Sequence, residues 1–78
     1  MDNMELYNNL FIESFKVNPD QLKNLEYNKV PSWDSVGHMV LIASLEEKFN
    51  IFFDTDDIID FTSYEKGKII LRKYNIDV

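Results

Sequence analysis

The residues best suited to chemistry in this chain lie in one short segment, residues 33–39, with the sequence WDSVGHM. Ser35 could act as a nucleophile, and His38 follows at a spacing that brings both side chains to one face of a helix. Asp34 adds a carboxylate beside them. A serine triad, however, also needs an acid that holds the far imidazole nitrogen, an oxyanion hole and a substrate pocket, for which so short a chain has little room. We therefore expect no enzymatic activity.

Asp34 and Ser35 also suit two roles that are not catalytic. Both residue types are common at helix N-caps, where a side-chain oxygen accepts a backbone N–H and contributes about 1 kcal/mol. Alternatively, Ser35 is a modification site that the start of a helix exposes. Free N–H groups and the positive end of the helix dipole would then accept the charge of an attached phosphodiester. The residue types alone leave both interpretations open.

Length and charge narrow the classes of function. The 78 residues have room for one hydrophobic core, so we expect a single domain over residues 1–78. The net charge of −6 disfavours nucleic acids and anionic membranes as partners and favours basic protein surfaces. Alternatively, the acidic residues only keep a small protein soluble. The chain has no cysteine, so it has no disulfide and no thiol of its own, and we expect no metal site.

The first residues of the chain, 1–5, contain no basic cluster. No apolar run approaches the roughly 20 residues that are needed to span a bilayer. We therefore expect a cytoplasmic protein that does not associate with membranes.

The first element that we predict is an amphipathic helix over residues 4–15, with Asp2 or Asn3 as its N-cap. Its inner face holds Tyr7, Leu10, Phe11, Ser14 and Phe15. Residues 16–33 show no sustained period, and we predict a long loop with one turn that Asn18 caps. The apolar anchors of this loop are Leu22, Leu25, Tyr27 and Val30.

The second predicted helix begins at Asp34 or Ser35 and ends near Phe49. Its buried stripe is Met39, Ile42, Leu45 and Phe49. Residues 51–53 are apolar and β-prone, but no second strand is available for pairing, so we predict a loop. Acidic residues then open a short third helix that runs to about residue 60.

The last predicted helix begins with a capping box formed by Thr62 and Glu65. Its buried residues are Tyr64, Ile69, Ile70 or Leu71, and Tyr74. The expected fold is an all-α four-helix bundle with three long helices and a short third one. A long first loop crosses over the other connections.

Residues 34–36 (DSV) and 41–51 (LIASLEEKFNI) resemble the second helix of acyl and peptidyl carrier proteins. In that family an Asp-Ser-Leu motif is often followed by Leu-Glu-Glu-x-Phe. The resemblance covers the whole chain, because the first helix, the long loop, the short acidic third helix and the Thr-Ser-Tyr start of the last helix occur in the family's order.

The resemblance implies a non-catalytic carrier. Ser35, in a motif with Asp34, would receive 4′-phosphopantetheine from coenzyme A through a phosphopantetheinyl transferase. The thiol of this arm would bear acyl or aminoacyl intermediates as thioesters, loaded by a ligase and passed to transferases or synthases with basic patches. On the same basis, partners would read the face formed by Val36, Val40, Ala43, Glu46 and Glu47. We expect a monomer, since transient docking needs an open surface.

The same segment departs from the carriers of fatty acid synthesis. Gly37 and Val40 stand where those carriers commonly have acids, and a glycine inside a helix costs about 1 kcal/mol relative to alanine. Trp33, His38 and Met39 look more like the specialised carriers of secondary metabolism, surface polysaccharide or aminoacyl transfer. Trp33 equally suits a lid that buries the loop on the core.

The cargo and one rival function stay open. In carriers an acyl chain can lie between the helices, although the corresponding residues are more often plain core. Here they are Phe11, Ile42, Phe53, Ile58 and Tyr64. Their large aromatic rings favour a short acyl or aminoacyl cargo. The rival function is an unmodified acidic helical adaptor that binds basic protein surfaces.

Overall fold

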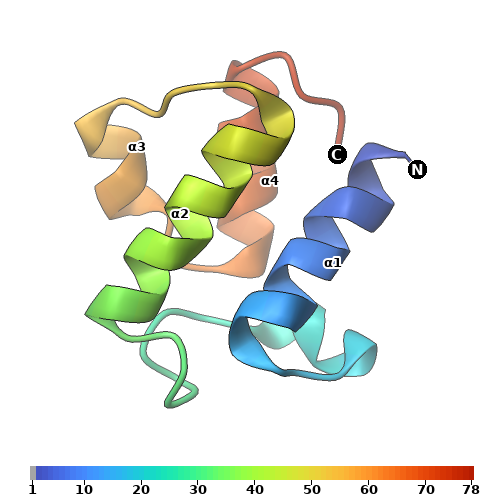
Figure 1. The fold of residues 1–78 in the computed structure, drawn as a ribbon, viewed down its shortest axis with the longest axis vertical. Helices are drawn as coiled ribbons and strands as arrows, with labels where there is room; N and C mark the ends of the chain where they lie inside the picture. Colours follow the sequence, from blue (N-terminus) through green and yellow to red (C-terminus); the bar gives the residue numbers. More distant parts are fainter. Residues whose placement is uncertain (1) are drawn as a thin grey trace.

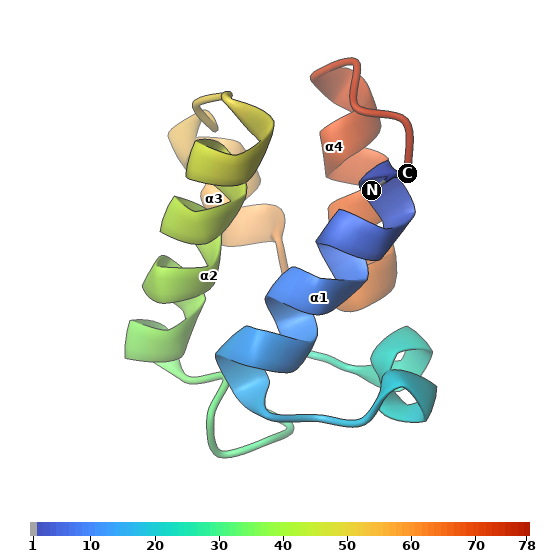
Figure 2. The same ribbon diagram turned by 45° about the vertical axis from the view of Figure 1, so that its right-hand side comes forward.

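The computed structural model describes residues 2–78, and over this range the chain is all-α, as predicted. The elements are α1 (Asn3–Phe15), the 3-10 helix η1 (Pro19–Asn24), α2 (Ser35–Phe49), α3 (Thr55–Asp60) and α4 (Tyr64–Lys73). Helix α1 packs against α2, and η1 contacts both α1 and α4. Figure 1 shows α3 beside α2 on the side away from α1, and Figure 2 shows η1 beneath α4 and next to the end of α1.

Helix α1 follows the sequence pattern closely. Asp2 is its N-cap, and the Asp2 carboxylate accepts a hydrogen bond from the backbone N–H of Glu5 at 2.8 Å. The helix ends at Phe15, and its C-cap Lys16 has a left-handed conformation with φ 57°. Its buried residues are Tyr7, Leu10, Phe11 and Phe15. Both the predicted cap and the predicted inner face are confirmed, except that Ser14 is only half-buried.

The long connection between α1 and α2 is anchored as expected. The backbone N–H of Asn18 donates to the side-chain oxygen of Gln21 at 2.7 Å, which closes the turn that begins η1. Leu22 and Leu25 are buried, while Tyr27 and Val30 are half-buried. These contacts place the end of the connection, and therefore the start of α2, against the core.

The start of α4 differs from the prediction. The N-cap is Ser63, whose Oγ accepts a hydrogen bond from the N–H of Lys66 at 2.9 Å, so the expected capping box of Thr62 and Glu65 is wrong. The cause lies in the long connection, because the N–H of Tyr27 donates to the carbonyl of Thr62 at 2.8 Å. This pairing belongs to an isolated antiparallel bridge that keeps Ser63 extended, at φ −159° and ψ 164°.

Helix α2 begins where predicted, but its buried stripe differs at two positions, because Phe49 is only half-buried and Met39 is exposed. Met39 is 53% exposed. The buried residues of the helix are Leu41, Ile42 and Leu45. At about 100° per residue, Met39 lies roughly 160° around the helix axis from Leu41. Because Leu41 faces the core, Met39 is turned outward next to α3. Residues 51–53 form a connection without strand structure, as predicted.

Aromatic rings dominate the core. Trp33 is fully buried and stacks on Phe15 with ring centroids 4.9 Å apart. Phe11 meets the edge of Trp33 at 5.5 Å and stacks with Phe61 at 6.2 Å. Trp33 thus covers the core as a lid at the end of the long connection, which confirms that interpretation of the residue.

Gly67 of α4 packs against the core at a point that leaves no room for a side chain. A Cβ atom at Gly67 would overlap the hydroxyl of Tyr7 and the ring of Phe61. Ile70 and Leu71 are buried as the pattern allowed. Ile69, however, is 54% exposed, which contradicts its predicted burial. At about 100° per residue it lies roughly 160° around the helix axis from the buried Gly67 and Leu71, so it faces outward.

The buried carboxylate of Asp57 ties α3 to the end of α4. It accepts hydrogen bonds from the Lys73 Nζ and the Tyr74 hydroxyl, both at 2.6 Å. The Tyr74 hydroxyl in turn accepts from the N–H of Asp54 at 2.9 Å. The hydrogen bond from Lys73, followed by that from Tyr74, holds the pKa of Asp57 below its ordinary value, whereas burial opposes this shift.

Candidate functional site

Ser35 is exposed and is the first residue of α2. The preceding residue, Asp34, is the N-cap, and its carboxylate accepts a hydrogen bond from the N–H of Gly37 at 2.8 Å. The carbonyl of Asp34 accepts from the N–H of His38 at 2.8 Å. The carboxylate of Asp34 is therefore bonded to the backbone of the first helical turn, and the cap interpretation of Asp34 is confirmed.

The Ser35 hydroxyl has a neighbour that the sequence did not reveal. Its Oγ lies 3.1 Å from the hydroxyl of Tyr27, within hydrogen-bond distance, and either group can be the donor. Tyr27 comes from the long connection, where its N–H is held by Thr62. A loop anchor eight residues before Ser35 thus reaches the candidate site.

His38 is occupied at both ring nitrogens. The indole N–H of Trp33 donates to Nδ1 at 3.0 Å, and Nε2 lies 2.8 Å from the carbonyl oxygen of Ile58. Because an indole nitrogen only donates, Nδ1 must be the acceptor. Nε2 therefore carries the proton and donates to Ile58, which assigns the tautomer from the two partners. The imidazole links the long connection, α2 and α3, and neither nitrogen is directed at Ser35.

Gly37 has a steric role at this helix start. A Cβ atom at Gly37 would overlap the backbone carbonyl oxygen of Ser32. The Ser32 hydroxyl is itself bonded to the carbonyl of Phe15 at 3.0 Å, which fixes this stretch of chain on the core. The sequence pattern showed only the helix propensity that Gly37 costs, and not the close approach of backbone that requires a glycine here.

An apolar hollow of about 380 Å³ opens beside Ser35, between the start of α2 and α3. Its lining residues are Tyr27, Ser35, His38, Met39, Ile58, Ile59, Phe61 and Thr62. Phe61 is fully buried and closes the inner side. Among residues 2–78, no Lys or Arg lines the hollow, so an anion at Ser35 would depend on neutral donors.

Of the core residues considered for cargo, only Ile58 lines this hollow. The others are buried in the core: Phe11, Ile42, Phe53 and Tyr64. Phe11, Ile42 and Phe53 therefore belong to the packed interior.

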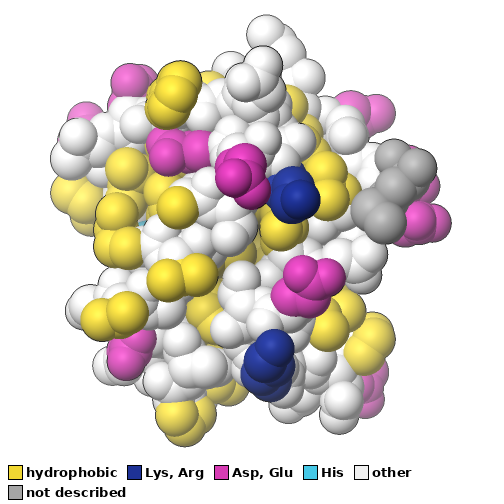
Figure 3. Space-filling model, in the orientation of Figure 1, with side chains coloured by type: hydrophobic (Ala, Val, Ile, Leu, Met, Phe, Trp, Pro, Cys, Tyr) yellow, Lys and Arg dark blue, Asp and Glu magenta, His cyan; other side chains and the backbone are white. Residues whose placement is uncertain are grey.

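The expected partner face of α2 is largely free. Val36, Val40, Ala43 and Glu47 are exposed. Glu46 is half-buried, and its carboxylate accepts a hydrogen bond from the N–H of Phe53 at 2.9 Å, so it holds the connection to α3. Exposed Met39 and Ile59 extend the face towards α3. Figure 3 shows hydrophobic side chains gathered over α2 and α3, with acidic groups beside them.

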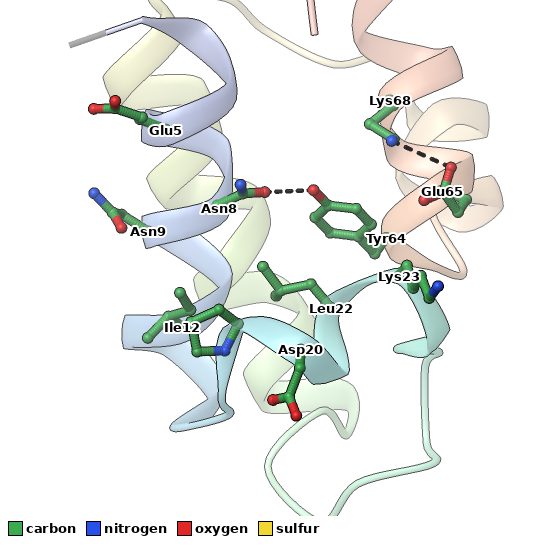
Figure 4. A pocket seen from close by; sticks show the side chains of 11 residues that line it. Glu5, Asn8, Asn9, Ile12, Asp20, Leu22, Lys23, Tyr64, Glu65 and Lys68 are labelled. Atoms are coloured by element: carbon green, nitrogen blue, oxygen red, sulfur yellow. Dashed lines mark hydrogen bonds and ion pairs between the residues drawn. The ribbon is translucent and has the colours of Figure 1, made fainter.

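A second, larger hollow of about 640 Å³ lies between α1, η1 and α4, away from Ser35 (Figure 4). Four of its polar side chains pair with one another: Asn8, Tyr64, Glu65 and Lys68. The Tyr64 hydroxyl donates to Asn8, and Lys68 lies 3.2 Å from Glu65 and over the Tyr64 ring. Among residues 2–78, no three His, Cys, Asp or Glu side chains are grouped so that they could hold a metal ion.

Searches of protein-family models and of curated proteins found no match to this chain. Within residues 2–78, no helix is both long and apolar enough to cross a membrane. The function must therefore be argued from the Ser35 site itself.

Proposed function

We propose that this chain is an acyl carrier protein that bears a 4′-phosphopantetheine arm on Ser35. The observation that carries the proposal is the position of Ser35, which is exposed at the start of α2 and next to an apolar hollow, while the neighbouring imidazole of His38 is bonded at both nitrogens. The DSV motif and the Leu-Glu-Glu-Lys-Phe ending of α2 support the same function by resemblance. The finer architecture that we propose is a carrier-like four-helix bundle with a long first connection.

In the proposed modification, coenzyme A is the donor and a phosphopantetheinyl transferase is the catalyst. The Ser35 oxygen attacks the phosphorus next to the pantetheine, forming a new O–P bond. The bond from that phosphorus to the oxygen of the second phosphate breaks, and 3′,5′-ADP leaves with the electron pair. A base of the transferase takes the Ser35 proton, because both nitrogens of His38 are already bonded.

The arm then supplies the thiol that the chain lacks, since the sequence contains no cysteine. A loading ligase would attach an acyl or aminoacyl group to this thiol, and the carrier would present the thioester without catalysing its reactions. Because the core behind the hollow is filled by aromatic rings, we propose a short acyl or aminoacyl cargo. The pathway that we propose is a specialised biosynthesis in the cytoplasm.

The proposed partners dock on the face of α2 that begins at Ser35. Val36, Val40 and Ala43 supply apolar contacts, while Glu47 meets Lys or Arg side chains of the transferase, the ligase or a downstream synthase. Glu46 contributes less, because its carboxylate is bonded to the chain. A net charge of −6 argues against nucleic acid or an anionic membrane as partner, and a monomer suits such transient contacts.

The rival function is an unmodified adaptor that uses the same exposed face of α2. One experiment distinguishes the carrier from the adaptor. Coenzyme A and a broad-specificity transferase should add one phosphopantetheine to the wild-type chain and none to Ser35→Ala, as read by intact mass. An adaptor would stay unmodified while still binding its basic partners through α2.

A further inference from the structure

Tyr27 places a phenol against the proposed attachment atom from outside α2. Its hydroxyl lies 3.1 Å from Ser35 Oγ. The residue is held firmly, because its N–H donates to Thr62 at 2.8 Å and its ring meets His38 edge-on at 5.5 Å. A fixed backbone and a packed ring aim the hydroxyl at Ser35 with little freedom to turn away.

Modification changes which of the two hydroxyls can donate. Transfer from coenzyme A forms the Oγ–P bond and removes the Ser35 proton, so Ser35 can no longer donate to Tyr27. The new phosphodiester instead carries a negative charge and free acceptor oxygens. The Tyr27 hydroxyl is then a hydrogen-bond donor that already lies next to Ser35 Oγ, the atom to which the arm is attached. His38 cannot take this role, since its one N–H is bonded to Ile58.

We propose that Tyr27 is a positioning residue for the modification. It orients the Ser35 hydroxyl before transfer and donates a hydrogen bond to the phosphate afterwards, which directs the root of the arm towards the hollow between α2 and α3. This inference rests on the proposed function, because it takes Ser35 as the attachment site. Among the described residues no Lys or Arg lines the hollow, so the phosphate relies on neutral donors, which are the phenol of Tyr27 and the backbone N–H groups at the start of α2.

The matched variants are Tyr27→Phe and Thr62→Val. Tyr27→Phe removes only the hydroxyl and keeps the ring that contacts Trp33 and His38. Thr62→Val removes another hydroxyl from the same hollow and leaves the backbone bond to Tyr27 intact. Both variants should unfold in urea close to the wild type, which separates positioning from folding.

The first readout is the loaded carrier. In Tyr27→Phe, the phosphorus NMR signal of the arm should shift and narrow as the phosphate loses its hydrogen bond and gains mobility. Transfer should slow several-fold through kcat, while Thr62→Val matches the wild type. Equal phosphorus signals and equal transfer rates in Tyr27→Phe and wild type would overturn the proposal and leave the carrier function standing.

The second readout needs no transferase. Phosphoserine is incorporated at position 35, and its second pKa, ordinarily about 6, is followed by phosphorus NMR. A hydrogen bond from Tyr27 favours the charged form, so this pKa should be lower with Tyr27 than in Tyr27→Phe. A lower pKa together with no transferase loading would refute the carrier function while supporting Tyr27 as the phosphate donor. Equal pKa values in both chains would refute the role of Tyr27.

Discussion

The indole nitrogen of Trp33 donates a hydrogen bond to Nδ1 of His38 at 3.0 Å. Trp33 is fully buried, so this bond satisfies a donor that has no access to water. The opposite ring nitrogen of His38 bonds to α3 through Ile58. His38 therefore acts as a structural link between three segments, although its spacing from Ser35 had suggested a base.

The first prediction concerns His38→Phe. This variant leaves the Trp33 N–H buried without an acceptor and removes the link to α3, so it should lower the free energy of unfolding by about 1–3 kcal/mol. Urea unfolding followed by Trp33 fluorescence measures this loss. Glu47→Ala, an exposed change on the same helix, is the control and should cost less than about 0.5 kcal/mol. A His38→Phe variant as stable as the control would contradict the assigned link.

The second prediction concerns Gly37→Ala. Alanine ordinarily stabilises a helix interior by about 1 kcal/mol relative to glycine. Here the added Cβ meets the carbonyl of Ser32, a backbone atom that is fixed on the core, so we expect a net loss of about 1–3 kcal/mol. Ser44→Ala in the same helix is the control. If urea unfolding finds Gly37→Ala more stable than wild type, the close packing at the start of α2 is wrong.

The third prediction concerns pH. The pKa of Asp57 is lowered in the fold from its ordinary value of 3.8, first by the hydrogen bond from Lys73. A lowered pKa contributes stability that is present above the unfolded value and is lost as pH falls through the folded value. Asp57→Asn should therefore destabilise the protein at neutral pH and flatten the loss of stability below about pH 4.

The matched control for that experiment is Asp56→Asn, which changes an exposed carboxylate in the same helix. Unfolding midpoints in urea are compared between pH 2 and pH 7 for the three proteins. Equal acid slopes for wild type and Asp57→Asn would show that the link between Asp57, Lys73 and Tyr74 contributes nothing to acid stability.

The fourth prediction concerns the proposed partner face. Glu47→Lys reverses an exposed charge on α2 and should raise the KM of the transferase about two- to fivefold at low salt, the range expected for an exposed ion pair. The effect should shrink at high salt because exposed charges are screened. Glu13→Lys makes the same charge change at an exposed position of α1, outside the proposed docking face of α2. An equal rise in KM for both variants would point to net charge rather than to docking on α2.

Local signals made much of the fold predictable. The caps Asp2 and Asp34 and the turn after Asn18 follow from short-range chemistry, and the structure has them where expected. The error at the start of α4 came from a contact distant in sequence. Thr62 failed as a cap because it pairs with Tyr27, and no local pattern contains that bridge.

In the candidate site, too, local features were predictable from the sequence and contacts between distant residues were not. Exposure of Ser35 at a helix start follows from its neighbours in the sequence. The phenol of Tyr27, the two partners of His38 and the carbonyl above Gly37 come from other segments, so only their spatial arrangement reveals them. The spacing of His38 from Ser35 is compatible with a catalytic base, because helical periodicity does not show which imidazole nitrogens are already hydrogen-bonded.

The most direct test of the account is the intact mass of the protein after incubation with coenzyme A, magnesium and a broad-specificity phosphopantetheinyl transferase. Wild type, Ser35→Ala and the control Ser44→Ala are treated side by side, and fragmentation locates any added group. The account predicts one added phosphopantetheine on Ser35 in wild type and in Ser44→Ala, and none in Ser35→Ala. Folded wild-type protein that several such transferases leave unmodified, or an arm found on another residue, would contradict it.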